Sequence, residues 1–87
     1  MVAYRPTVDD NARRVLQVIR ERGVAPGWQV MSEASVSDAD LVNAVGTLMK
    51  LGLIKASGGA SNPKEVCQAY FNILPSQASL AEMILSS

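Results

Sequence analysis

The side chains that could carry chemistry in this sequence are few, and none of them lies in a catalytic pattern. The 87 residues contain no histidine, which excludes acid–base catalysis by imidazole. Cys67 is the only cysteine, and one cysteine without histidine does not make an ordinary zinc site. Asp38 and Asp40 are too sparse for a metal site, and Gly58-Gly59 lacks the strand, lysine and helix of a phosphate-binding loop. We therefore expect no catalytic residue, no metal and no cofactor, and a protein that acts by binding a partner.

The composition fits one small domain over residues 1–87 with a mainly aliphatic core. Hydrophobic residues make up 48% of the chain and aromatic residues only 5%. Eight Lys and Arg balance eight Asp and Glu, whereas a domain that binds nucleic acid usually has a basic surface. A single cysteine and the lack of a secretory signal indicate the cytoplasm, and the apolar runs are too short to span a membrane.

A first amphipathic helix is expected over residues 8–22, after a short arm over residues 1–6. Residues 7–10 resemble a capping box, and Gly23 suits a helix end. The apolar positions of this segment recur at intervals of three and four residues, which is the helical period. They are Ala12, Val15, Leu16 and Ile19.

A second amphipathic helix is expected over residues 38–51, with Ser37 as N-cap and Gly52 at its end. Residues 24–27 are expected to form a turn. The following segment, 28–34, fits either a short helix or a strand, because its apolar spacing satisfies both periods. The apolar stripe of the second helix consists of Leu41, Val45, Leu48 and Met49.

Residues 53–74 are expected to form a β-hairpin, followed by a last helix over residues 76–86. The first strand covers 53–56, and a loop rich in Gly, Ser and Pro covers 57–63. The second strand covers 66–74 and ends at Pro75, and Ser76 is the expected cap of the last helix. The alternation places one set of side chains on the inner face of the second strand: Cys67, Ala69, Phe71 and Ile73.

This order of elements resembles the winged helix-turn-helix superfamily. The resemblance is sharpest over residues 29–54, where Val36-Ser37 matches the turn of the family. The family also ends its longer helix in Leu-x-x-x-Gly-Leu-Ile, which Leu48 and residues 52–54 match. The sizes of Met31 and Ala34 are exchanged relative to the family pattern, and Ser35 stands where the family often has Gly. The resemblance implies an α+β fold with a three-helix core, a β-hairpin wing and a C-terminal helix.

The resemblance also implies where duplex DNA would be bound, because the family inserts the longer helix into the major groove. Asn43 could pair with adenine, and Thr47 could contact a thymine methyl group or a phosphate. The groove-facing positions are Asp38, Ala39, Val42, Asn43, Gly46 and Thr47. Phosphate contacts would come from Lys50, Lys55 and Lys64, with Arg5 or Arg13 and Arg14 on the flank.

The charge pattern keeps a second hypothesis open. Residues 28–54 contain three acidic residues and one basic residue, a net charge of −2, and phosphate binding needs the opposite sign. The alternative is a winged-helix module that binds a protein, with Ala39, Val42 and Tyr70 as contacts. Trp28 is expected to be a core residue or an anchor at the helix entry. The last helix carries an apolar stripe of Leu80, Met83, Ile84 and Leu85. This stripe could form the seam of a homodimer, or it could pack on the core of its own chain.

Overall fold

The computed structural model describes residues 8–86. The first helix begins where a local side-chain cap is available. Helix α1 spans Asp10–Arg22. The Asp9 side chain accepts a hydrogen bond from the Ala12 backbone N–H at 2.8 Å, so the helix begins two residues later than the capping-box pattern predicted. Thr7, the first residue of that pattern, lies outside the described residues. Gly23 ends the helix with a φ of 79°, as expected from the sequence.

The segment after α1 differs from the expected turn. Val24–Pro26 is strand β1, and it pairs antiparallel with a strand almost fifty residues later in the chain. Helix α2 spans Gly27–Ala34, so the helical interpretation of this segment is correct and the strand interpretation is wrong. Three residues are too few for their alternation to predict a strand. The hydrogen bonds that make this segment a strand come from its distant partner.

Helix α3 spans Asp38–Lys50 and agrees closely with the expected second helix. The Ser37 hydroxyl accepts a hydrogen bond from the Asp40 backbone N–H at 3.1 Å, which satisfies one of the free donors of the first turn. Gly52 follows with a φ of 76°, a left-handed conformation that glycine adopts without steric cost. Short-range rules were sufficient here because both ends of the helix are capped locally.

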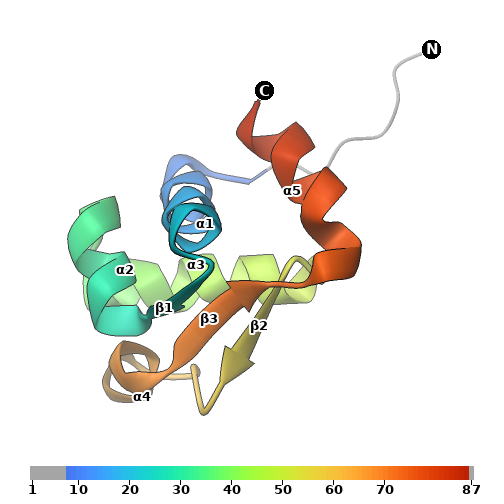
Figure 1. Cartoon of the computed structure of the whole chain (residues 1–87). Coiled ribbons are helices and arrows are strands. Elements are labelled where there is room, and N and C mark those ends of the chain that lie inside the picture. Colours follow the sequence, from blue (N-terminus) through green and yellow to red (C-terminus); the bar gives the residue numbers. More distant parts are fainter. Residues whose placement is uncertain (1–7, 87) are drawn as a thin grey trace.

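The sheet has three antiparallel strands in the order β1-β3-β2. Strand β2 spans Ile54–Ser57 and strand β3 spans Tyr70–Ile73. In this register, Phe71 lies opposite both Ala25 and Ala56, and it points into the core. The expected hairpin partners are therefore present, but a third strand from the segment after α1 completes the sheet (Figure 1).

The connection between β2 and β3 corrects the expected second strand. Pro63–Gln68 forms helix α4, with Pro63 in its first turn, and the Asn62 side chain accepts a hydrogen bond from the Glu65 backbone N–H at 2.9 Å. Val66 is fully buried, and α4 packs against α2 and α3. Cys67 is therefore a half-buried helical residue and not part of a strand face. The alternation at residues 66–74 predicted a strand throughout. The Asn62 cap, Pro63 in the first turn and the burial of Val66 instead make residues 63–68 helical.

The last helix begins later than expected. Pro75–Gln77 forms one 3-10 turn, and helix α5 spans Ala78–Leu85. No side chain caps α5, so Ser76 does not have the capping role that the sequence suggested. Within residues 8–86, no helix is both long and apolar enough to cross a bilayer.

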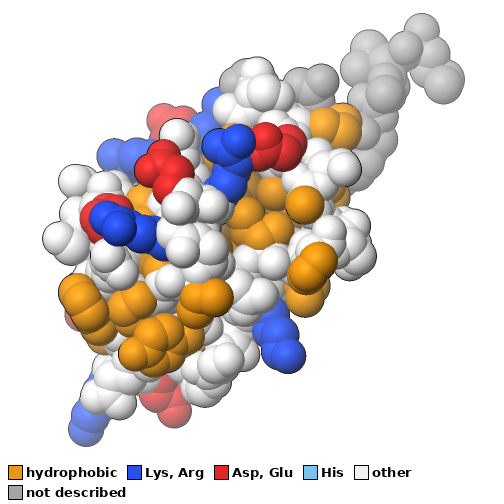
Figure 2. Space-filling view, in the orientation of Figure 1, with side chains coloured by type: hydrophobic (Ala, Val, Ile, Leu, Met, Phe, Trp, Pro, Cys, Tyr) orange, Lys and Arg blue, Asp and Glu red, His pale blue; other side chains and the backbone are white. Residues whose placement is uncertain are grey.

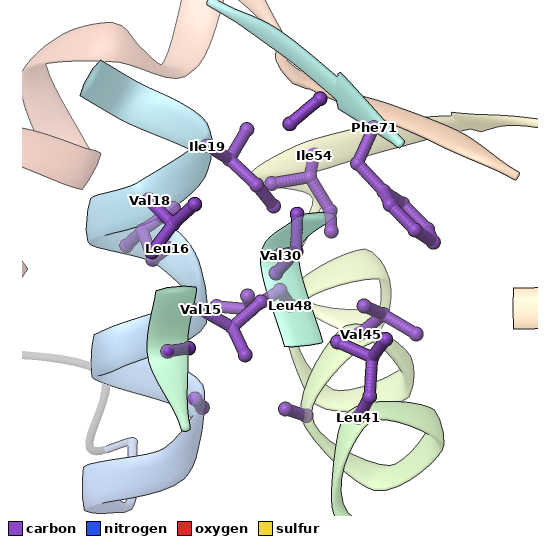
Figure 3. Packing of buried hydrophobic residues seen from close by; sticks show 14 of the residues in the cluster. Val15, Leu16, Val18, Ile19, Val30, Leu41, Val45, Leu48, Ile54 and Phe71 are labelled. Atoms are coloured by element: carbon purple, nitrogen blue, oxygen red, sulfur yellow. The ribbon is translucent and has the colours of Figure 1, made fainter. Parts of the chain in front are cut away.

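The core forms where α1, α2 and α3 meet the inner face of the sheet. Figure 3 shows Val15, Ile19 and Leu48 pointing into the same space, with Phe71 covering it from the sheet. Figure 1 shows α2 and α5 on opposite sides of α1, and both pack on it. The described residues include no buried charged side chain, so apolar burial holds the elements together.

Candidate nucleic-acid interface

The turn between α2 and α3 fixes the relative position of the two helices. Ser35 adopts the left-handed conformation with a φ of 56°, at the position where winged-helix proteins often have glycine. The next residue, Val36, is buried, and its N–H donates to the Met31 carbonyl at 3.2 Å. This sharp reversal leaves α3 with one face on the core and the opposite face in solvent.

The exposed face of α3 carries small and polar side chains. Ala39, Asn43, Gly46 and Lys50 follow one another along the helix at intervals of three and four residues, and all are exposed. Within the described residues, no hydrogen bond holds the exposed Asn43 side chain. The Thr47 hydroxyl donates to the Asn43 backbone carbonyl at 3.1 Å. Val42 is half-buried against the core. We name the four exposed positions the outer face of α3.

The two ends of this helix differ in charge. Asp38 and Asp40 are exposed in the first turn, where carboxylates interact favourably with the helix dipole. The Asp38 carboxylate accepts a hydrogen bond from the Ala39 N–H at 2.8 Å. Lys50 is the basic residue of the last turn. An incoming phosphate would therefore meet repulsion at the beginning of the helix and attraction at its end.

The segment between β2 and β3 lies beside α3. An open groove of about 490 Å³ separates them, lined by Gly46, Met49 and Lys50 on α3 and by Ala60 and Ser61. Helix α4 folds back onto α2 and α3. Lys64 is exposed in the first turn of α4, and Lys55 is exposed on the outer face of the sheet.

The arginines belong mainly to α1, and several of them make specific contacts. The Arg22 guanidinium donates two hydrogen bonds to the Glu33 carboxylate on α2, at 2.6 and 3.1 Å. This contact is the main reason that the pKa of Glu33 lies below its ordinary value. Arg20 forms an ion pair with Glu82 on α5.

The two arginines expected to flank DNA also lie on α1. Arg14 is exposed and donates to the Asn11 side chain at 2.6 Å. Arg13 is half-buried. Arg5, the third flanking candidate, lies outside the described residues. The structure thus brings Lys50 together with Asn43 and Gly46 on one helix face and places the candidate arginines on another helix.

Comparison with solved structures settles the fold. A variant of Lactococcus lactis ZitR aligns with 93% of this chain at a TM-score of 0.72 and 14% identity. A MarR-family transcriptional regulator from Silicibacter pomeroyi aligns with 91% at 0.72 and 14%, and the transcriptional regulator PA4135 with 91% at 0.70 and 16%. The chain has a winged helix-turn-helix fold. It spans only 51–55% of these three solved chains, and no family model or curated protein sequence matches it.

In winged-helix terms, α2 and α3 form the helix-turn-helix, and the β2–β3 connection is the wing. This wing is not the simple hairpin that the sequence predicted, because α4 occupies part of it. The resemblance at residues 29–54 was therefore a correct guide to the fold, while the alternation at residues 66–74 was a poor guide to the wing.

The candidate protein-binding residues lie on two different elements of the winged helix. Ala39 is exposed and Val42 half-buried, and both lie on α3. Tyr70 is half-exposed at the beginning of β3, on the outer face of the sheet. The three residues thus come from the helix-turn-helix and from the sheet, rather than from one helix face.

The candidate dimer seam on α5 is divided between the core and the solvent. Ile84 is only 2% exposed and belongs to the core of its own chain, as does Ala81. Leu80 and Leu85 are partly buried against the same core, while Met83 is 48% exposed. Of the four residues in the expected stripe, Met83 is therefore the one most available to a partner.

Sequence reasoning missed one surface residue of this domain, Trp28. It was expected in the core or at a helix entry, and it does lie in the first turn of α2, but its side chain is 59% exposed. Its position directly after Pro26-Gly27 was the available signal, because a residue in a first helical turn often points away from the core.

Proposed function

We propose that this winged-helix domain acts without catalysis as a regulator that binds duplex DNA through the outer face of α3. The observation that supports this most directly is the exposed Asn43, with Gly46 one turn later on the same face. Apart from the neighbouring backbone of α3, a Cβ at Gly46 would meet no atom of residues 8–86 within 4 Å, so the helix backbone is open to close approach. A cytoplasmic site of action is part of the same proposal.

The outer face of α3 has the chemistry of major-groove recognition. An asparagine amide can bind adenine in a bidentate arrangement, because its NH2 group donates to N7 and its oxygen accepts from the N6 amino group, which is a frequent base contact. Lys50, one helical turn beyond Gly46, would contact a phosphate. Small side chains at Ala39 and Gly46 would let the helix enter deeply, since neither fills space between the backbone and the base edges.

The affinity of this interaction is expected to be modest. Phosphate contacts provide most of the affinity of such domains, and the lysines near α3 and the wing are Lys50, Lys55 and Lys64. The acidic first turn of α3 opposes them. Arg13 and Arg14 on α1 would add contacts only if the duplex extended along that helix.

The test is fluorescence anisotropy with a labelled random-sequence duplex, at about 20 mM and about 150 mM salt, which spans the range of strong and weak screening. We expect micromolar binding at low salt that is largely lost at high salt. Lys50→Gln should weaken binding severalfold. The matched control is Ser79→Asp, which changes the net charge by the same amount on an exposed position of α5.

The outcomes separate two functions. Binding that falls with salt and with Lys50→Gln, but not with Ser79→Asp, supports recognition of DNA by α3. No binding to any duplex at low salt contradicts it and favours the second candidate, a module that binds a protein. The observation in favour of that candidate is the acidic first turn of α3, because Asp38 and Asp40 repel phosphate but would suit a basic peptide or protein surface.

A further inference from the structure

The outer face of α3 from Ala39 to Gly46 contains no side chain that usually reads guanine. Guanine is recognised mainly by Arg or Lys, which donate to its O6 and N7 atoms together. Every arginine of the chain lies within the first 22 residues, and the one cation of α3, Lys50, lies in its last turn. Recognition helices contact base edges with their N-terminal residues. In that half of the outer face, the Asn43 amide matches adenine.

The carboxylates of the first turn of α3 do not favour guanine either. The Asp38 carboxylate accepts a hydrogen bond from the Ala39 N–H at 2.8 Å. Asp40 is exposed, one helical turn before Asn43. A carboxylate accepts from the amino group of adenine or of cytosine, and the acceptor atoms O6 and N7 of guanine repel it. Asp40 therefore opposes guanine at its own position but does not by itself distinguish adenine from cytosine.

Thr47 presents a methyl group beside this adenine-matching amide. Its hydroxyl donates to the Asn43 backbone carbonyl at 3.1 Å, so the hydroxyl hydrogen is already used and does not bind a phosphate. The side chain is exposed, and its methyl group is free for an apolar contact. Threonine methyl groups contact the 5-methyl group of thymine in the major groove. Of the two roles that the sequence left open for Thr47, the hydrogen bond thus favours the thymine contact.

A second apolar surface lies on the other side of Gly46. Successive helix positions are about 100° apart, which places Met49 and Thr47 on opposite sides of Gly46. The groove between α3 and the wing is lined by Gly46, Met49 and Ala60, with Lys50 at the same groove. Met49 is 42% exposed. An apolar groove beside one cation fits the edge of a thymine and the phosphate next to it.

The wing side of this groove is held in place. The Ser61 hydroxyl donates to the Glu65 carboxylate of α4 at 2.9 Å, and α4 packs against α3. Ala60 and Ser61 are therefore fixed beside α3 in the unbound chain. The hydrogen bond also uses the hydroxyl hydrogen of Ser61, so this side chain adds no free donor to the apolar groove.

Contacts with base edges matter more for this chain than for a basic one. Figure 2 shows Lys and Arg side chains interspersed with Asp and Glu over the part of the molecule where α1 and α2 lie, and the chain is neutral overall. Attraction to phosphates supplies affinity that does not depend on the base sequence. A surface with weak phosphate attraction therefore depends more strongly on the bases that it contacts.

We propose that the outer face of α3 selects duplexes rich in A·T pairs, with Thr47 and the groove at Met49 contacting the 5-methyl groups of thymine. This inference rests on the proposed DNA binding and adds a base preference to it. The same methyl group occurs in 5-methylcytosine, so the chemistry recognised is a pyrimidine 5-methyl group. Asn43 favours thymine as its source, because the base paired with thymine is the adenine that an asparagine amide matches.

The test compares four duplexes of about 20 base pairs, roughly two helical turns, by fluorescence anisotropy at about 20 mM salt. One contains A·T pairs in mixed order, and the second has uracil for every thymine, which removes the 5-methyl groups. The other two contain G·C pairs with either cytosine or 5-methylcytosine. We expect the thymine duplex to bind about tenfold more tightly than the uracil duplex, since each of two contacted methyl groups contributes roughly three- to fourfold. It should also bind at least about tenfold more tightly than either G·C duplex.

Four variants locate the methyl contacts. Thr47→Ser keeps the hydroxyl and removes the methyl group, whereas Thr47→Val keeps the methyl group and removes the hydroxyl. Thr47→Ser and Met49→Ser should each lower the ratio of thymine to uracil affinity about threefold, and Thr47→Val should leave it unchanged. Met83→Ser is the matched control for Met49→Ser, because Met83 is comparably exposed on α5. Circular dichroism checks that each variant is folded, and the two positions on α3 test the proposal independently.

The outcomes distinguish this inference from the proposed function. Salt-dependent binding with equal affinity for the thymine and uracil duplexes would leave the proposed function standing and overturn the base preference. No binding to any of the four duplexes would contradict both. Tighter binding of the 5-methylcytosine duplex than of the thymine duplex would overturn the assignment to thymine. A thymine preference that survives in both Thr47→Ser and Met49→Ser would reflect the shape of the DNA and overturn the assignment to these side chains.

Discussion

Ser35 is a residue whose backbone conformation conflicts with its side chain. It ends α2 in the left-handed region with a φ of 56°, which costs a residue with a Cβ roughly 1 kcal/mol or more relative to glycine. The reversal after α2 requires this conformation, because Val36 must turn back into the core. Ser35 is therefore a position where the sequence of this chain is not optimal for stability.

Replacing Ser35 by glycine should stabilise the protein. We expect Ser35→Gly to raise the free energy of unfolding by about 0.5–1 kcal/mol, because glycine adopts a positive φ without steric cost. Urea unfolding followed by circular dichroism measures the change. Ser32→Gly is the control, since Ser32 is exposed within α2, and there glycine should lower stability by about 0.5 kcal/mol. A loss of stability in both variants would contradict the left-handed turn.

Two helical glycines should respond oppositely to the same substitution. A Cβ at Gly27 would lie 1.7 Å from the Val66 carbonyl oxygen, so Gly27→Ala should cost about 3 kcal/mol as α4 is forced away from α2. Gly46→Ala has open space around the new methyl group and should stabilise α3 by about 0.5–1 kcal/mol. Urea midpoints of the two variants give the comparison, and similar values for both would contradict the close contact between α4 and α2.

At the scale of elements, α4 is the feature that distinguishes this wing from a simple β-hairpin. It begins at an Asn62 cap, buries Val66, and packs on both helices of the helix-turn-helix. The Glu65 carboxylate also accepts a hydrogen bond from the Ser61 hydroxyl at 2.9 Å, which ties the preceding loop to the helix. The wing is therefore held against the domain and shortened, rather than extended as a long hairpin.

The role of α4 can be tested by removing its one buried side chain. Val66→Ala should lower the free energy of unfolding by about 2 kcal/mol, because two methyl groups leave a fully buried site. Gln68→Ala, on the exposed side of the same helix, should change it by less than about 0.5 kcal/mol. Equal effects at both positions, measured by urea unfolding, would show that the segment does not pack as a helix on α2 and α3.

The ion pair between Arg22 on α1 and Glu33 on α2 should make the free energy of unfolding depend on pH in the acid range. The Arg22 hydrogen bonds lower the pKa of Glu33 in the folded chain, so its ionised form stabilises the fold above the ordinary glutamate pKa. This contribution is lost as pH falls through the lower folded value. Between about pH 5 and pH 3, around the usual glutamate range, unfolding free energy should fall less steeply in Glu33→Gln than in the parent chain. Parallel curves would contradict this contribution.

At the scale of the whole molecule, charge limits how strongly DNA can be bound. The chain is neutral overall, and two of its arginines form ion pairs within the molecule. Lys50, Lys55 and Lys64 remain as the exposed cations near α3 and the wing. Each phosphate contact contributes about 0.9 to the salt dependence of binding.

The number of phosphate contacts can be counted from this salt dependence. If the three lysines are the contacts, the logarithm of the binding constant should fall with the logarithm of salt concentration with a slope of about −3 per chain. Anisotropy titrations at several salt concentrations measure the slope. A slope of about −5 or steeper would require Arg13 and Arg14 as well, and Arg14→Gln would then reduce it by about one contact.

The sequence by itself determined the elements that are long and capped locally. The stripes of α1 and α3, the Ser37 cap and the ends at Gly23 and Gly52 were all predicted, because each depends on residues within one or two helical turns. The order of these elements was enough to indicate a winged helix. The groove-facing candidates on α3 came from the resemblance to winged-helix proteins, and the structure places Ala39, Asn43 and Gly46 of that set on the outer face, while Val42 is half-buried.

Only the tertiary structure decided the short segments and the surfaces. Val24–Pro26 is a strand because Tyr70–Ile73 pairs with it, and Pro63–Gln68 is a helix because α2 and α3 bury Val66. Segments of three to six residues have too few local interactions to fix their own conformation, so distant partners choose it. The same applies to exposure: Trp28 and Ile84 are both large hydrophobic residues, and only packing places one in solvent and the other in the core.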